Sequence, residues 1–241
     1  MHFTKIPILV YHSVSNDNSI MSLNVKIFEE QIKYLKKKKF KSICFSEINP
    51  EEKNQIIITF DDGYKDNLLN AMPILKKYNF KATCFLVSNF IGKKNYWDSN
   101  KSNYSTKELL SQNDIKEWVS NGMDIGSHSH NHLDLTSVNI NTLLNELAFS
   151  KSTLEDLFSR QIENFSYPFG KVNLQTHNEV KKLYENAVTT NRSRYYVDKH
   201  DNHLIPRIDM GKNMSNFKLF LKLKTVYEDI KFKRDEITHK L

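Results

Sequence analysis

The chain has 241 residues, of which 39% are hydrophobic and 12% aromatic. This composition excludes a disordered chain, and the length suits one α/β domain with a full core. Lysine and arginine number 35 against 28 acidic residues, a net charge of +7. The excess suits an anionic partner such as a membrane surface or a phosphorylated glycolipid, or it only reflects a composition rich in lysine and asparagine. We expect no nucleic-acid partner, because no motif for one is present.

The N-terminus has no basic segment followed by a long apolar run, so we expect no signal peptide. No apolar stretch is long enough to span a bilayer. These features predict a cytoplasmic protein. The basic C-terminal segment suggests that this protein could also contact an anionic membrane surface peripherally. Cys44 and Cys84 lie in apolar surroundings and are predicted to be buried, reduced thiols.

Strands and helices alternate along the chain, which predicts a mainly parallel sheet. The run Ile6–Tyr11 predicts the first strand, with His12 at its end. The patterns that follow predict helices at 22–39, 67–78 (kinked or split by Pro73), 114–121, 136–158 (capped by Ser137 or Asn139), 177–185 and 216–240. They predict strands at 40–45, 82–87, 165–167, 187–190 and 204–209, and a long polar loop at 89–113. We expect one domain over 1–241, with a C-terminal helix at about 213–240 that packs on it or lies on a membrane.

Another apolar run, Ile56–Ile58, leads within two residues into the adjacent carboxylates Asp61 and Asp62, followed by Gly63. This pattern predicts a buried strand that ends in a tight turn. The carboxyl end of such a strand is where α/β folds usually keep their chemistry. Because neighbouring strand residues point to opposite sides, the two carboxylates can face different partners. The alternative is an ordinary surface turn.

Three of the nine histidines lie within five residues, at positions 128, 130 and 132. Histidines four residues apart, such as His128 and His132, can meet on one face of a helical turn and bind one metal ion. A carboxylate as third ligand leaves positions open for water and substrate. Nitrogen and oxygen ligands suit zinc and other divalent transition metals. The alternative is a polar loop with a structural histidine.

Together these motifs resemble the polysaccharide deacetylase family, carbohydrate esterase family four. Thr59–Gly63 is similar to the first family motif, His128–His132 to the second and Phe165–Gly170 to the third. The resemblance covers about residues 6–209. It implies a distorted, incomplete (β/α) barrel. It also implies a metal-dependent hydrolase that removes N-acetyl groups from an amino-sugar glycan or glycolipid.

The resemblance implies roles for individual residues. Asp62, His128 and His132 would bind the divalent metal, with Zn²⁺ as the first expectation and Co, Ni, Fe or Mn as alternatives. Asp61 would be the general base. The third motif suggests Tyr167, Pro168 and Phe169 as substrate-binding residues. Trp97 is a further candidate as an aromatic platform for a sugar ring, with a packing role in its loop as the alternative.

The chain departs from the family pattern in two places. The family's usual general acid, a histidine in a late Leu-x-His motif, is absent after Asp209. His12 is the candidate instead, because it belongs to a Tyr-His-Ser-Val motif that resembles rearranged family members. The arginine that usually precedes the third motif is also absent, and Arg207 is the candidate to pair with Asp61 and lower its pKa. The alternatives are a capping histidine and a surface arginine.

These departures leave other functions open. A deformylase or another amide hydrolase could use the same site, and a glycan-binding relative without catalysis could keep the fold. The oligomeric state is not predicted by any feature of the sequence.

Overall fold

The computed structural model describes residues 4–98, 102–211, 215–225 and 227. Its centre is a sheet with the strand order β10-β9-β8-β7-β6-β2-β12, and every pairing along this order is parallel. The strands are β2 (Ile8–Tyr11), β6 (Gln55–Phe60), β7 (Thr83–Leu86), β8 (Asp124–Ser127), β9 (Asn164–Ser166), β10 (Asn186–Val188) and β12 (Ile208–Asp209). The prediction of a mainly parallel sheet is confirmed.

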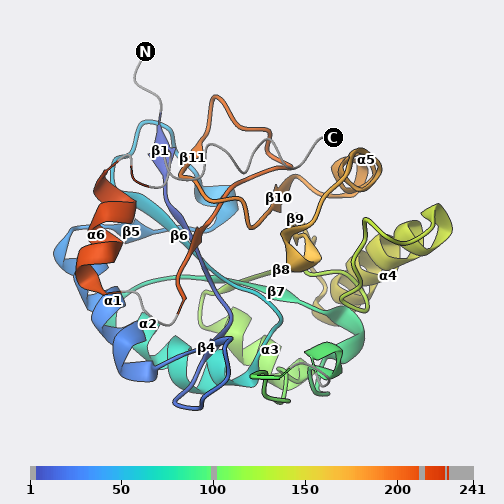
Figure 1. Cartoon of the computed structure of the whole chain (residues 1–241), viewed down its shortest axis with the longest axis horizontal. Helices are drawn as coiled ribbons and strands as arrows, with labels where there is room; N and C mark the ends of the chain where they lie inside the picture. The colour runs from blue at the N-terminus through green and yellow to red at the C-terminus, as the bar shows by residue number, and fades with distance from the viewer. Residues whose placement is uncertain (1–3, 99–101, 212–214, 226, 228–241) are drawn as a thin grey trace.

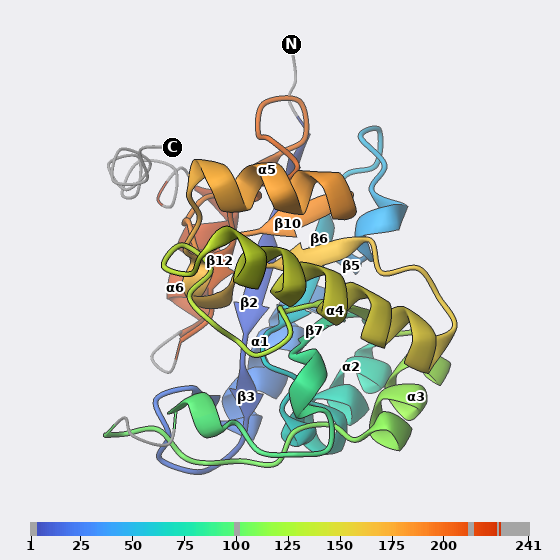
Figure 2. The same ribbon diagram turned by 90° about the vertical axis from the view of Figure 1, so that its right-hand side faces the viewer.

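The sheet curls so that its two edge strands approach each other, with helices around the outside (Figure 1). A single parallel bridge joins Val188 at the end of β10 to Ile205, just before β12. The expected distorted, incomplete (β/α) barrel is therefore confirmed. In Figure 2 the carboxyl end of β2 points toward β3 (Ser13–Val14) and the loops at the bottom of the view. The motif residues follow the carboxyl ends of such strands, so they gather at one end of the barrel.

The first helix begins later than its apolar pattern predicted. Ser22–Leu23 form strand β4, which pairs with β3, and helix α1 spans Val25–Lys37. Asn24 caps it, because its side chain accepts hydrogen bonds from the first backbone N–H groups. The pairing of β4 with β3 is a tertiary interaction that the helical spacing does not reveal.

The second helical segment changes its winding next to Pro73. A π-helical segment, η2 (Asn67–Ala71), runs directly into helix α2 (Met72–Tyr78), with Pro73 in the first turn of α2. The expected kink or split is therefore a change from π- to α-helical winding and not a break in the helix. Helix α4 (Ile140–Phe158) is capped by Asn139, one of the two predicted caps.

The other elements are short, and their boundaries differ from the predictions by a few residues. They are β1 (Lys5–Ile6), β5 (Lys41–Ser42), β11 (Tyr195–Tyr196), the 3₁₀ helices η1 (Phe45–Glu47), η3 (Ser88–Phe90), η4 (Tyr96–Asp98) and η5 (Pro168–Gly170), and the helices α3 (Gln112–Ser120), α5 (Leu174–Leu183) and α6 (Asn216–Lys224). The predicted strand at 40–45 is reduced to β5, because the chain turns into η1. Helix α5 begins before residue 177, since Asn173 caps it through Thr176. Figure 2 shows α5 beside α4.

The core lies between the sheet and these helices. Tyr11, Phe28, Phe60 and Trp118 pack ring against ring, with centroids 5.1–5.9 Å apart. The apolar residues of β2 and β6 are buried on both faces, as expected for a parallel sheet under helices. Cys44 and Cys84 are free and buried, which confirms their prediction. Burial raises the pKa of Cys44 to about 12.

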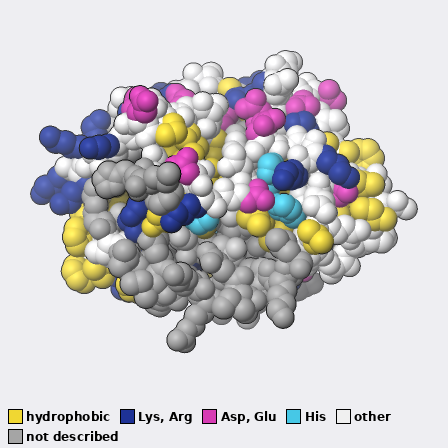
Figure 3. Space-filling view, turned by 90° about the horizontal axis from the view of Figure 1, so that it is seen from above, with side chains coloured by type: hydrophobic (Ala, Val, Ile, Leu, Met, Phe, Trp, Pro, Cys, Tyr) yellow, Lys and Arg dark blue, Asp and Glu magenta, His cyan; other side chains and the backbone are white. Residues whose placement is uncertain are grey.

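The predicted C-terminal helix at 216–240 is described only as α6, and most of the remainder lies outside the described residues. Leu219 and Leu223 of α6 are buried, whereas Phe217 and Phe220 are exposed. No helix in the described part of the chain is long and apolar enough to cross a membrane. Figure 3 shows a face that carries both basic and acidic side chains, so this face is not uniformly positive. Peripheral membrane contact, a cytoplasmic location and the single domain over 1–241 stay predictions.

Candidate metal centre

The end of β6 places two adjacent carboxylates in one pocket. The strand ends at Phe60, and the N–H of Asp61 still donates to the Tyr11 carbonyl. Asp62 then has φ 73° and Gly63 φ 76°, both in the left-handed region. Glycine suits this turn because its φ is one that side chains rarely adopt, and an added Cβ would lie 2.9 Å from the end of the Leu86 side chain. The turn brings Asp61 and Asp62 to line the same pocket, whereas strand alternation alone would have separated them.

The two histidines follow β8 in a loop. This differs from the helical turn that their spacing suggested, because Ser129 (φ 64°) and His132 (φ 59°) adopt left-handed conformations. The loop still brings both rings together around one carboxylate. The Nε2 atom of His128 lies 3.4 Å from Asp62 Oδ1, and that of His132 lies 3.3 Å from the same atom.

These three residues fit a divalent cation. Their ligand atoms all lie within 4.8 Å of one another, and all three side chains are buried. The Nδ1 atom of His128 lies 2.7 Å from the Ser166 carbonyl oxygen. Because a carbonyl only accepts, Nδ1 must carry a proton, and Nε2 is left to bind a cation. Two imidazole nitrogens and a carboxylate oxygen are the ligands of many catalytic zinc sites.

The charges of the site also favour a cation. Burial raises the pKa of Asp62, but the two histidines lower it by more, so this pKa lies well below its ordinary value. Burial lowers the pKa of His128, but the Asp62 and Asp61 carboxylates and the Ser166 carbonyl together raise it by more. Burial dominates at His132 and holds its pKa below the ordinary value. The pocket thus draws positive charge next to Asp62, and a metal ion would replace a proton there.

Asp61 is held apart from this group by Arg207. The guanidinium donates to both carboxylate oxygens, at 2.7 Å each. It also donates to the Thr189 carbonyl at 2.9 Å and to the Thr59 hydroxyl at 3.1 Å. Arg207 is fully buried, so it is not a surface arginine. Burial raises the pKa of Asp61, but Arg207 lowers it by more, and the net pKa lies below the ordinary value.

The pocket around these groups has a volume of about 110 Å³. His12 lines it together with both aspartates and both histidines. Trp97 also lines it and stacks on His132, with ring centroids 4.6 Å apart. The ring thus packs on a candidate metal ligand and borders the pocket as well. The remaining lining residues are Met21, Asp98, Tyr104, Phe169, Gly170 and Thr190.

The third motif divides into buried and pocket-facing residues. Phe169 lines the pocket and approaches His132, with ring centroids 4.7 Å apart. Tyr167 and Pro168 are buried and do not line it. The Tyr167 hydroxyl donates to the His203 carbonyl at 3.1 Å, which anchors the motif to the neighbouring loop.

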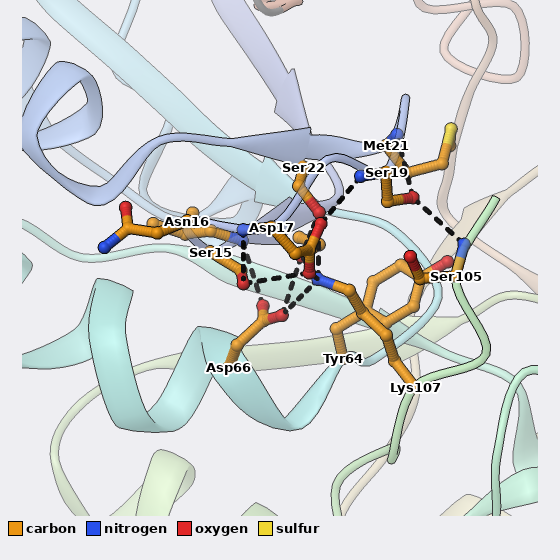
Figure 4. A network of polar contacts seen from close by, with 12 residues as sticks. Ser15, Asn16, Asp17, Ser19, Met21, Ser22, Tyr64, Asp66, Ser105 and Lys107 are labelled. Atoms are coloured by element: carbon orange, nitrogen blue, oxygen red, sulfur yellow. Dashed lines mark hydrogen bonds and ion pairs between the residues drawn. The ribbon is translucent and has the colours of Figure 1, made fainter. Parts of the chain in front are cut away.

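A network of polar contacts fastens the loops that wall the pocket (Figure 4). The ammonium of Lys107 donates to Ser22 at 2.8 Å and to Asp66 at 3.1 Å, and it pairs with Asp17. Ser19 accepts a further hydrogen bond from the backbone N–H of Ser105. These contacts join the 15–22 segment, which carries Met21, to the 93–109 segment, which carries Trp97 and Tyr104.

Sequence reasoning missed Ser166. Its hydroxyl lies 3.3 Å from Asp61 and 3.1 Å from Arg207, while its carbonyl accepts from His128. One residue therefore contacts both the candidate base and a candidate metal ligand. Its position inside the third motif, Phe165–Gly170, was the available signal. Asp98 and Met21 had no signal beyond their proximity in sequence to Trp97 and His12.

Comparison with known proteins gives the family. The polysaccharide deacetylase family profile matches residues 48–188. The chain belongs to the polysaccharide deacetylase family. YxkH of Bacillus subtilis (strain 168), assigned to the same family, is 35% identical over 195 residues, which cover 77% of this chain and 64% of YxkH. The chain thus spans about two thirds of the length of that relative.

Other family members extend the likeness over most of the chain. The poly-β-1,6-N-acetyl-D-glucosamine N-deacetylase of Staphylococcus aureus (strain MRSA252) is 27% identical, over 83% of this chain and 77% of that protein. The solved structure of the Streptococcus pyogenes deacetylase PplD in complex with acetate has a TM-score of 0.79 and 26% identity, over 92% of this chain and 100% of that chain. IcaB from Ammonifex degensii, at 18% identity and a TM-score of 0.74, shares the fold.

Deacetylases of this family depend on a metal ion, and Asp62, His128 and His132 form the candidate site for one here. The family resemblance predicted from the three motifs is confirmed. The profile also covers residues 48–188, which include all three motifs.

Proposed function

We propose that this protein is a metal-dependent N-deacetylase of an amino-sugar glycan or glycolipid. The observation that carries the proposal is the grouping of Asp62, His128 and His132, with the Arg207-bound carboxylate of Asp61 beside them. The S. aureus relative supports the substrate class, because its name states that it deacetylates a polymer of N-acetylglucosamine.

Asp62, His128 and His132 hold the divalent cation, for which Zn²⁺ is the first candidate. When bound, such a cation polarises the acetamide carbonyl and lowers the pKa of a water molecule. The chain's own contribution is to fix the three ligand atoms and to keep the site buried. Ser166 holds the ring of His128 through its carbonyl oxygen, which sets the proton on Nδ1.

Asp61 acts as the general base. A carboxylate that binds a cation is a poor proton acceptor, so a second carboxylate must stay off the metal. Arg207 keeps Asp61 ionised and oriented. The Oδ2 atom of Asp61 accepts hydrogen bonds from both Arg207 and the Ser166 hydroxyl. As a water oxygen forms its bond to the acetyl carbon, Asp61 takes the water's proton.

His12 acts as the general acid. It stands at the carboxyl end of β2 and lines the pocket with the other catalytic residues. When the bond between carbonyl carbon and nitrogen breaks, His12 gives a proton to the departing amine. The products are acetate and a free amino sugar, which account for all atoms of the amide and the water.

The pocket walls position the sugar. Phe169 and Trp97 offer aromatic surface next to His132. Tyr167 and Pro168 contribute from the buried side by fixing the backbone from which Phe169 projects. The pocket has a volume of about 110 Å³, so most of a polymer would lie outside it.

The test is release of acetate and free amine from β-1,6-linked N-acetylglucosamine oligomers, run beside N-formyl analogues. The proposal predicts acetate release by the zinc-loaded protein, with loss of turnover in Asp61→Asn. Turnover of formyl substrates alone would favour the deformylase alternative. Binding of the oligomers without turnover would favour the glycan-binding alternative and contradict the proposal.

A further inference from the structure

The loop that carries the two candidate metal ligands rests on one buried carboxylate. Glu146 of helix α4 is only 4% exposed. Its Oε2 atom accepts from the backbone N–H of His130 at 3.0 Å and from that of Asn131 at 2.8 Å. Its Oε1 atom accepts from the side-chain amide of Asn131 at 2.5 Å. One helix side chain therefore binds three donors of the loop between His128 and His132.

This loop needs support, because two of its residues are in an unfavourable backbone conformation. Ser129 and His132 both have φ near +60°, where the Cβ atom crowds the backbone. Residues keep such conformations only when the surrounding structure holds them. The hydroxyl of Ser129 accepts a hydrogen bond from the N–H of His132 at 3.0 Å. Glu146 accepts hydrogen bonds from the two N–H groups between them, those of His130 and Asn131.

The opposite side of the loop is held by η3. The carbonyl oxygens of Ser129 and His130 accept from the N–H groups of Ser88 and Asn89. The Asn131 side chain receives a further hydrogen bond from the Asn89 amide at 2.7 Å. Hydrogen bonds from η3 and from α4 thus hold the loop on both sides, and Glu146 supplies the carboxylate on the α4 side.

The two metal-binding rings are anchored differently. His128 donates through Nδ1 to the Ser166 carbonyl. In the part of the chain that the structure describes, the buried Nδ1 atom of His132 has no hydrogen-bond partner. A metal-binding histidine usually has its second nitrogen anchored. The position of His132 therefore depends on its backbone and on the rings of Trp97 and Phe169 that pack on it.

We propose that Glu146 is a positioning residue for the metal centre, which holds the 128–132 loop so that His132 faces Asp62. It acts through the backbone and touches neither substrate nor metal. The inference rests on the proposed metal site. The affinity for the metal then depends in part on a residue of α4 that lies 14 positions after His132 in the sequence.

The test compares Glu146→Gln and Glu146→Leu with a matched control, Glu155→Gln. Glu155 lies on the same helix and also accepts a hydrogen bond from a backbone N–H, that of Ile162 at 2.9 Å. This contact does not involve the 128–132 loop. In Glu146→Gln an amide donor faces the Asn131 amide, and in Glu146→Leu both backbone N–H groups lose their acceptor. We therefore expect Glu146→Gln to weaken the support of the loop less than Glu146→Leu does.

The first measurement is hydrogen exchange of the His130 and Asn131 amides in metal-free protein. We expect exchange to be about tenfold faster in the Gln variant and faster still in the Leu variant, because charge-assisted hydrogen bonds are lost. The second is Zn²⁺ affinity by chelator competition, which should fall about 10- to 100-fold. Glu155→Gln should change neither.

Unchanged exchange in a folded Glu146→Gln would overturn the inference. So would faster exchange with zinc affinity within twofold of the wild type, since this would mean that Glu146 stabilises the fold without setting the site. If Glu146→Leu fails to fold, the Gln variant and Asn131→Ala, which removes one donor, decide the question. If the wild type binds none of Zn²⁺, Co²⁺, Ni²⁺, Fe²⁺ and Mn²⁺, the proposed function fails, and the exchange rates still decide whether Glu146 holds the loop.

Discussion

Arg207 donates two hydrogen bonds of 2.7 Å to the Asp61 carboxylate across a sequence separation of 146 residues. The pair forms because β12 lies beside β2, and β2 beside β6, in the curled sheet. The pair separates the two adjacent carboxylates. Asp62 faces the histidines, while Asp61 is bound to Arg207, which suits the proposed role of Asp61 as the proton acceptor.

Replacing Asp61 with Asn should abolish turnover and leave metal binding intact. The amide cannot accept the proton, so the rate should fall by a factor of about 10² to 10⁴. The measurement is turnover together with zinc content per chain. Asp62→Asn is the matched control, because it should lose both. Activity retained in Asp61→Asn would rule out its role as the base.

Replacing Arg207 with Met should destabilise the fold. Both partners are buried, and removal of one leaves an uncompensated charge, which costs about 3–5 kcal/mol. Urea unfolding at neutral pH measures the loss. The double variant Asp61→Asn/Arg207→Met should recover part of it, because no buried charge is then left unpaired. A loss below about 1 kcal/mol, the range of surface pairs, would contradict the buried pair.

The sequence was informative where chemistry is local. The apolar run before Asp61 predicted a strand, and the motifs predicted which residues meet. Arg207 could only be a candidate, because its partner is fixed by strand order and not by spacing. The left-handed turn at Asp62 and the support from Glu146 could not be predicted, since both depend on atoms distant in the sequence. The same reason explains why Ser22–Leu23 form a strand and not a helix start.

Replacing Lys107 with Met should change the acid sensitivity of the fold. Burial raises the pKa of Asp17, but Lys107 together with hydrogen bonds from Ser22 and Ser19 lowers it by more, so the folded pKa lies below the unfolded one. Such a carboxyl stabilises the folded state above its unfolded pKa of about 3.9, and this contribution is lost as the pH falls through the folded pKa. Lys107→Met should therefore be less stable than the wild type at pH 7.

The same variant should lose less stability than the wild type on acidification from about pH 6 to about pH 2, because the pair is already gone. Urea midpoints across this range measure the difference. Lys65→Met is the control, since Lys65 pairs with an exposed carboxylate, Glu108. An equal pH dependence in wild type and Lys107→Met would show that the network in Figure 4 does not stabilise the loops.

Replacing Gly170 with Ala should disturb the pocket. A Cβ at this position would lie 1.9 Å from the Thr190 hydroxyl, and the residue has φ +67°. Gly122→Ala is a matched control, because Gly122 has φ +79° but nothing lies within 4 Å of the added carbon. The control should cost about 1–2 kcal/mol from the backbone alone.

Gly170→Ala should cost more than this control and should also lower kcat/KM, since Phe169, Gly170 and Thr190 line the pocket. Thermal unfolding and the acetate assay measure the two effects. Equal stability loss in both variants, with unchanged kcat/KM, would contradict the tight contact between the third motif and Thr190.

We propose above that Asp62, His128 and His132 bind one divalent metal ion. Anomalous scattering from crystals grown with Zn²⁺, recorded above and below the zinc edge, tests this directly. We expect one strong peak between the three side chains in the wild type and in Asp61→Asn, and none in His128→Ala. Wild-type crystals with no peak there, or with the three side chains pointing apart, would contradict it.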